Sequence, residues 1–137
     1  FNKFQDFVEQ VLTAKHDFTA AGHVMKVMAS NGAPVATNTV KANITEITAE
    51  NGYPSGGSDA QNAMTETSGT ATVTATDVTW TASGGTFGPL RYISMYNDTT
   101  STPAKPLVGW WDYGSSVTPA AGESFVVDFG ASVLTLA

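Results

Sequence analysis

Three short runs decide the fold: GGTFGPLRYISMYND over residues 84–98, PLVGWWDYG over residues 106–114 and ESFVVDF over residues 123–129. Aromatic and β-branched residues, which favour strands, fill the runs, and Gly, Pro and Asn-Asp breaks separate them. We therefore expect strands at about 90–96, 106–112 and 123–129. A further strand is expected at 132–136, after a compact, hairpin-like break at Gly130-Ala131.

A period of two begins upstream of these runs, at Gly69. Threonines at 70, 72, 74 and 76 alternate with other residues, which predicts a strand with one polar threonine face. Apolar alternation continues through Val78, Trp80 and Ala82 after an expected bulge at residues 77–78. Residues 22–30 predict an earlier strand, which the Asn31-Gly32 turn signal closes.

In the N-terminal segment, residues 1–16, the apolar side chains recur with a different period. Residues 2–15 have the spacing of an amphipathic helix, with apolar side chains at Phe4, Phe7, Val8, Val11 and Leu12. Asn2 is placed to cap this helix, and His16 lies at its far end. Such a helix either packs on the β body, residues 22–137, or docks onto a neighbouring subunit.

The order of elements predicts the fold class. A helix, a strand, a long loop with a helical turn at 43–49 capped by Asn43, and about five further strands are typical of a mainly β protein. We expect an antiparallel β-sandwich or barrel, of jelly-roll or immunoglobulin-like type. Because no linker divides the chain, residues 1–137 are expected to form one domain.

The composition limits the possible partners. Only 13% of the residues are charged, the net charge is −6 and there is no cysteine. The six basic residues are scattered, whereas binding to nucleic acid requires clustered Lys or Arg, so nucleic acid is not an expected partner. No apolar stretch approaches the ~20 residues of a membrane span, and no signal peptide pattern is visible, so no membrane partner is expected.

The polar residues suggest no catalytic, metal or cofactor site. His16 and His23 lack further ligands at a suitable spacing, so we expect no metal site. Ser115 lies outside a nucleophile-elbow pattern. Asp98, Asp112 and Asp128 lie in or near the strand block, where a glycosidase pair is one interpretation and strand-end carboxylates are the simpler one. Asn97-Asp98-Thr99 is expected to cap a turn.

The aromatic residues are the best candidates for a binding surface. On one strand, Trp110 and Trp111 must point to opposite faces of the sheet, so one can be buried while the other faces outward. An outward Trp111, or Tyr113, favours a protein interface or a sugar-stacking platform. The alternative is that both sheet faces are covered, one of them by the N-terminal helix.

Several segments resemble a family of small virion proteins of tailed bacteriophages. The similarity lies in residues 43–53, Gly56-Gly57, residues 81–85, 88–92 and 95–99, the run 106–114, and the N-terminal Phe-Asn-Lys-Phe. These motifs are structural and carry no catalytic residue. The resemblance therefore implies a non-enzymatic virion component without a cofactor.

The resemblance most readily implies a capsid decoration, or cement, protein. Such a protein would bind the major capsid protein on the outer surface of the virion, commonly as a homotrimer, after synthesis in the bacterial cytoplasm. A tail or neck component and a carbohydrate-binding module are the alternatives. The candidate interface residues are Phe4, Phe7, Val8, Val11, Trp110, Trp111 and Tyr113.

Overall fold

The computed structural model describes residues 1–137 and has a mainly β, antiparallel architecture. Its elements are β1 (Asn2–Lys3), α1 (Phe7–Leu12), β2 (Met25–Ser30), the 3-10 turn η1 (Lys41–Asn43), β3 (Ser58–Asp59), β4 (Ala63–Thr67), β5 (Thr70–Thr74), β6 (Val78–Thr81), β7 (Leu90–Asn97), β8 (Leu107–Val117), β9 (Ser124–Val127) and β10 (Leu134–Leu136). One helix and one 3-10 turn accompany the strands, so the expected fold class is confirmed.

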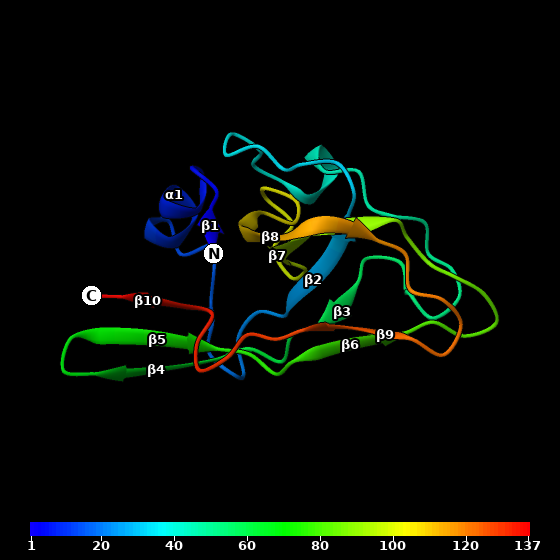
Figure 1. The fold of residues 1–137 in the computed structure, drawn as a ribbon. Coiled ribbons are helices and arrows are strands. Elements are labelled where there is room, and N and C mark those ends of the chain that lie inside the picture. The colour runs from blue at the N-terminus through cyan, green and yellow to red at the C-terminus, as the bar shows by residue number, and fades with distance from the viewer.

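The first layer is a five-stranded sheet in the order β1-β8-β7-β2-β3 (Figure 1). The long strands β7 and β8 form its centre, where Ile93 pairs with Trp111 and Ser94 pairs with Trp110. Side chains on both faces of β2 and β7 are buried, including the polar side chains of Ser30, Ser94 and Asn97.

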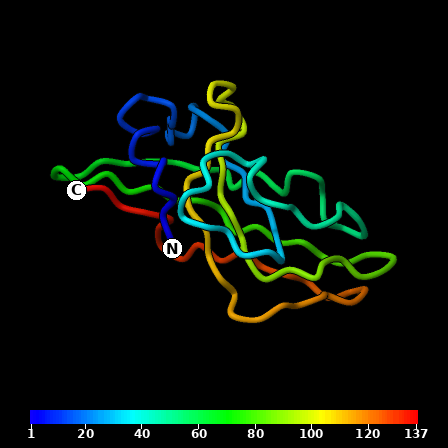
Figure 2. Tube along the Cα trace, turned by 90° about the horizontal axis from the view of Figure 1, so that it is seen from above, coloured from blue at the N-terminus to red at the C-terminus, as the bar shows by residue number.

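The second layer lies across this sheet and consists of two smaller ones, β10-β5-β4 and β6-β9. The strands β5 and β6 follow one another along one path, and β9 and β10 return beside them (Figure 1). The β4–β5 hairpin and β10 extend away from the rest of the molecule (Figure 2). The threonines of β5 at positions 70, 72 and 74 share one face with Thr65, Thr67 and Thr135 of the neighbouring strands, as the alternation predicted.

The main core fills the space between the two layers. Its 20 buried residues include Met25, Val27 and Ile93 from the first layer and Trp80 and Phe125 from the second. A smaller cluster lies on the other face of the first sheet: Phe4, Met28, Ile44, Tyr96 and Leu107. The two clusters make the fold a sandwich with an additional covered face.

The N-terminal helix is shorter than expected. Residues 2 and 3 form β1, which pairs with Trp110 and Gly109 of β8, and α1 spans only Phe7–Leu12. Asn2 does not cap a helix; its side-chain amide donates to the carbonyl oxygen of Trp110. Pairing with a distant strand therefore overrides the helical periodicity at this end. At the other end the helix stops at Leu12, Thr13 is its C-cap, and Ala14 adopts a φ of 56°.

Three further predictions about elements require correction. The expected strand through residues 70–82 is divided between β5 and β6, which pair with different strands. The strands β9 and β10 do not form a hairpin, because β9 pairs with β6 and β10 with β5. The expected helical turn at 43–49 lies instead at η1, where the side-chain oxygen of Asn43 accepts the backbone N–H groups of Thr39 and Val40.

Candidate interaction surface

The two adjacent tryptophans lie on opposite faces of β8, as their spacing predicted. Trp110 packs on Phe4, with ring centroids 4.5 Å apart, and adjoins the smaller cluster. Trp111 faces the main core and makes edge contacts with Phe1 at 5.3 Å and Phe129 at 5.7 Å. Both side chains are half-buried, so neither is a fully exposed platform and neither is fully enclosed.

A shallow groove lies between β8 and β9. Its lining residues are Ile93, Trp111, Asp112, Tyr113, Phe125, Val126, Val127 and Asp128, around a volume of about 160 Å³. We call these residues the β8–β9 groove. Tyr113 is 59% exposed and Val126 50% exposed. The Tyr113 ring contacts Phe125 edge-on, with centroids 5.3 Å apart, which holds it at the rim.

The backbone beside the groove is an open sheet edge. On the side away from β7, β8 pairs only with the two residues of β1, at Gly109 and Trp110. The remainder of β8, residues 111–117, has no strand on that side. An unpaired edge next to apolar side chains is the arrangement that accepts an added strand or a flat partner surface.

Four other candidate interface residues come from the N-terminal segment, and the structure divides them. Phe4 and Phe7 are 0% and 2% exposed, so both belong to the core of this chain and are removed from the candidate interface. Val11 packs against the main core as a partly buried residue, whereas Val8 is exposed. The helix therefore packs on the β body, the first of the two alternatives, and only its outer side meets solvent.

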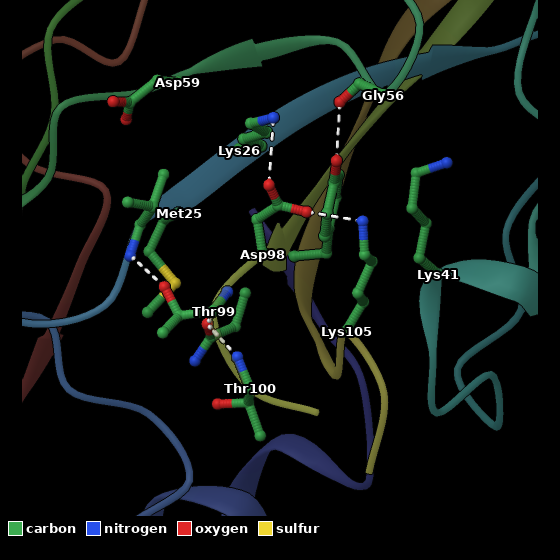
Figure 3. A network of polar contacts seen from close by, with 12 residues as sticks. Met25, Lys26, Lys41, Gly56, Asp59, Asp98, Thr99, Thr100 and Lys105 are labelled. Atoms are coloured by element: carbon green, nitrogen blue, oxygen red, sulfur yellow. Dashed lines mark hydrogen bonds and ion pairs between the residues drawn. The ribbon is translucent and has the colours of Figure 1, made fainter. Parts of the chain in front are cut away.

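The three strand-block aspartates have identifiable partners. Asp98 lies between Lys26 at 3.0 Å and Lys105 at 2.7 Å (Figure 3). Burial alone would raise the pKa of Asp98, but hydrogen bonds from the two lysines outweigh it and hold the pKa below its usual range. Asp128 accepts the backbone N–H of Gly130.

Asp112 and Asp128 both line the β8–β9 groove. Arg91 binds Asp112 through two hydrogen bonds of 2.8 and 2.9 Å. These bonds, with one from the Gly114 N–H, lower the pKa of Asp112. A glycosidase acid requires a raised pKa, so Asp112 does not have the property of that acid.

The two histidines, which are distant from β7 in sequence, meet at its end. The side-chain N–H₂ of Asn97 lies 2.9 Å from Nδ1 of His23 and 3.3 Å from Nδ1 of His16. His16 is buried between the rings of Phe7 and Phe18 and so is not an exposed helix cap. Burial and, to a smaller extent, His23 lower the pKa of His16 to about 4.

Asn97 caps a turn, as its Asn-Asp-Thr sequence predicted. Its side-chain oxygen accepts the backbone N–H groups of Thr99 and Thr100, at 3.0 and 3.2 Å. The contact of the Asn97 side-chain nitrogen with two histidines was not predicted. No local pattern signals it, since the partners are more than 70 residues away.

No group of three or more His, Cys, Asp or Glu side chains is arranged to hold a metal ion. None of the helices has the length and apolar character needed to span a membrane. Comparison with known proteins gave no match to a family model, a curated protein or a solved structure.

Proposed function

We propose that this protein is a structural component of a tailed-bacteriophage virion: a capsid decoration protein that binds the outer face of the major capsid lattice. The observation that carries the proposal is the β8–β9 groove, where exposed apolar side chains adjoin an open sheet edge. The resemblance of residues 106–114 to phage virion proteins covers the same strand.

The groove has the features of a small protein interface. Tyr113 and Val126 are exposed apolar side chains at its rim, and Trp111 and Phe125 support them from below. A rigid aromatic residue at the centre of an interface commonly accounts for about 2 kcal/mol of binding free energy. A decoration protein needs only such modest contacts, because many copies bound across subunit boundaries act together against capsid expansion.

The charge distribution favours an external position. The net charge is −6, and four of the six basic side chains, those of Lys26, Lys41, Arg91 and Lys105, are paired with carboxylates of the same chain. An acidic protein with few free cations is repelled by packaged DNA. We therefore place the protein outside the capsid, at a neutral or basic site. The homotrimer in this proposal is what the resemblance to phage virion proteins implies.

The proposal is tested with phage particles that encode this chain but are prepared without it. Labelled recombinant protein is added, and its binding to the particles is measured by co-sedimentation, with the bound position located by cryo-electron microscopy. We expect saturable binding to the head, and Tyr113→Ala should weaken it by about 30-fold, which corresponds to about 2 kcal/mol.

The matched control is Val35→Ala, which truncates a side chain that is 54% exposed and lies outside the groove. This variant should bind like the unmodified protein. Binding only to the tail or neck, or a ring of six or twelve copies, would contradict a decoration role and support the tail or neck alternative. Absence of binding to any particle would contradict a virion role.

A second candidate function is carbohydrate binding. The observation that favours it is that Trp111 and Tyr113 share one groove with the carboxylates of Asp112 and Asp128, since sugars bind aromatic faces and polar side chains together. Binding on a glycan array that disappears in Tyr113→Ala, with no binding to phage heads, would establish this alternative in place of decoration.

A further inference from the structure

The segment between α1 and β2 is fastened to the end of β7 through one buried side chain, Asn97. Its N–H₂ donates one proton to the carbonyl oxygen of Lys15 and the other to Nδ1 of His23, both at 2.9 Å, and Nδ1 of His16 lies 3.3 Å from the same nitrogen. The hydroxyl of Thr100 reinforces the attachment with a 2.8 Å hydrogen bond to the same Lys15 carbonyl. Figure 3 shows Thr99 and Thr100, which follow Asn97 at this end of β7.

The orientation of the Asn97 amide determines the protonation of both imidazoles. Its oxygen is held by the backbone N–H groups of Thr99 and Thr100, so the amide cannot be reversed without placing N–H₂ against two donors. Its N–H₂ must then face the histidines, so Nδ1 of His23 accepts from it, and a proton on Nδ1 of His16 would point at a nitrogen that cannot accept it. In this geometry His16 and His23 are neutral and carry their proton on Nε2.

A second proton on His16 has no acceptor. On His16, a proton on Nδ1 would face the Asn97 amide donors, and the buried Nε2 has no partner. Nδ1 of His23 also receives the backbone N–H of Asp17 at 3.3 Å and lies 3.4 Å from the hydroxyl of Thr100. Protonation of His16 would therefore place its Nδ1–H against an amide donor at the point of attachment.

The surroundings offer little to stabilise the added charge. The His16 ring lies between Phe7 of α1 and Phe18 of the loop. Across a groove of about 480 Å³, β4, β5 and β10 present Met64, Ala71, Val73 and Leu136.

Neither of the two acidic side chains nearby forms an ion pair with His16. Asp17 is the one acidic side chain that lines this groove, and its Oδ1 accepts both the N–H and the hydroxyl of Thr19. Asp98, the residue after Asn97, is paired with Lys26 and Lys105. Both histidines line the open groove, which gives protons a path to them.

We propose that Asn97, His16 and His23 form an acid-sensitive latch, which holds residues 13–24 against β7 when His16 is neutral and releases this segment when His16 is protonated. The released segment connects α1 to β2, so opening loosens the N-terminal part of the chain while the five-stranded sheet stays paired. The latch does not depend on what binds the β8–β9 groove.

The direct test is hydrogen exchange measured by mass spectrometry at pH 7 and pH 5, with rates corrected for the intrinsic effect of pH. Protection of residues 13–24 should fall by about 20-fold at pH 5, as expected for a histidine whose pKa rises from about 4 when latched to 6.5 when released. Protection of β7 and β8 should not change. Equal protection of residues 13–24 at both pH values would overturn the proposal.

The variant Asn97→Asp distinguishes the proposed latch from a role of Asn97 in packing alone. A carboxylate keeps one oxygen for Thr99 and Thr100 and turns the other towards the histidines, where it accepts from protonated rings. We expect the pH dependence to reverse, with residues 13–24 better protected at pH 5 than at pH 7. Loss of protection at pH 5, as in the unmodified protein, would contradict the latch.

Two measurements remain decisive if Asn97→Asp does not fold. The double variant His16→Phe/His23→Gln removes both imidazole rings and should give the same protection at both pH values. In the unmodified protein, ¹⁵N NMR of the imidazoles at pH 7 should show both as Nε2–H tautomers. A ring protonated on Nδ1, or a pH response that persists in the double variant, would overturn the proposal.

Discussion

Replacing Tyr53 by phenylalanine removes one hydroxyl group from the interior, and the structure gives the expected cost. Tyr53 is 2% exposed, and its hydroxyl oxygen accepts the backbone N–H of Ala29, in β2, at 2.9 Å. The same hydroxyl donates to the carboxylate of Glu46 at 2.9 Å. Burial raises the pKa of the Tyr53 phenol, so the group remains protonated at any pH of the experiment.

The hydroxyl matters because it completes the edge of β2. The short strand β3 pairs only with Lys26 and Val27, so Ala29 has no strand beside it on that side. Two hydrogen bonds take the place of a neighbouring strand there. The Tyr53 hydroxyl accepts the Ala29 N–H, and the backbone N–H of Ile47 donates to the Ala29 carbonyl at 3.0 Å. Tyr53→Phe leaves the N–H of a fully buried residue without an acceptor, which costs about 1–3 kcal/mol.

Urea unfolding followed by tryptophan fluorescence measures this cost. We expect the free energy of unfolding to fall by about 2 kcal/mol, equivalent to roughly 7 °C in Tm for a chain of this length. The matched control is Tyr113→Phe, which removes a hydroxyl from an exposed side chain and should change stability by less than about 0.5 kcal/mol. If the two variants are equally stable, the hydroxyl of Tyr53 does not close the edge of β2.

Three further predictions concern stability. Gly57→Ala should cost at least about 3 kcal/mol in urea unfolding, because an added Cβ would lie 1.8 Å from the Val27 carbonyl oxygen; Gly69→Ala, also at a positive φ but with open space, should cost about 1 kcal/mol. Burial lowers the folded-state pKa of His16 to about 4 from 6.5. The contribution of the neutral His16 to the free energy of unfolding is therefore complete above pH 6.5 and is lost as the pH falls towards 4. Unfolding free energy should therefore decrease by about 2 kcal/mol from pH 7 to pH 5, and His16→Phe should abolish most of this change. Phe4→Ala, at a fully buried site, should lower the unfolding free energy by about 3–5 kcal/mol in the same assay; a loss below 1 kcal/mol would contradict its place in the core.

The strands of the aromatic block were predictable because their signal is local. Aromatic and β-branched residues between Gly, Pro and Asn-Asp breaks predict strands at 90–96 and 106–112, and β7 and β8 lie there. Successive side chains of a strand lie on opposite faces. The same rule correctly separated Trp110 from Trp111. It did not tell how deeply each lies, because Phe1, Phe4 and Phe129 cover them from distant parts of the chain.

The errors occur where a distant partner decides the structure. Residues 2 and 3 have a helical pattern yet pair with β8, more than 100 residues away. Similarly, β9 and β10 were expected to pair with each other, but β6 and β5 are their partners. Alternation marks a strand and its faces and carries no information about which strand lies beside it.

The candidate sites divide in the same way. The sequence identified Tyr113 and Trp111 as possible contact residues, because a group of large aromatic side chains close together in the chain can be seen without a structure. It could not place Val126 beside them, because the groove forms only when β8 and β9 approach from opposite layers. The interior positions of Phe4 and Phe7 likewise depend on how the N-terminal segment folds back on the sheet.

By itself, then, the sequence determined a mainly β, antiparallel fold, the faces of its longest strands and the turn made by Asn97, because each follows from interactions between residues near one another in the chain. Only the tertiary structure decided the order of strands, the groove between β8 and β9 and the meeting of Asn97 with His16 and His23. These features arise from contacts between segments far apart in sequence, which no local period or spacing encodes.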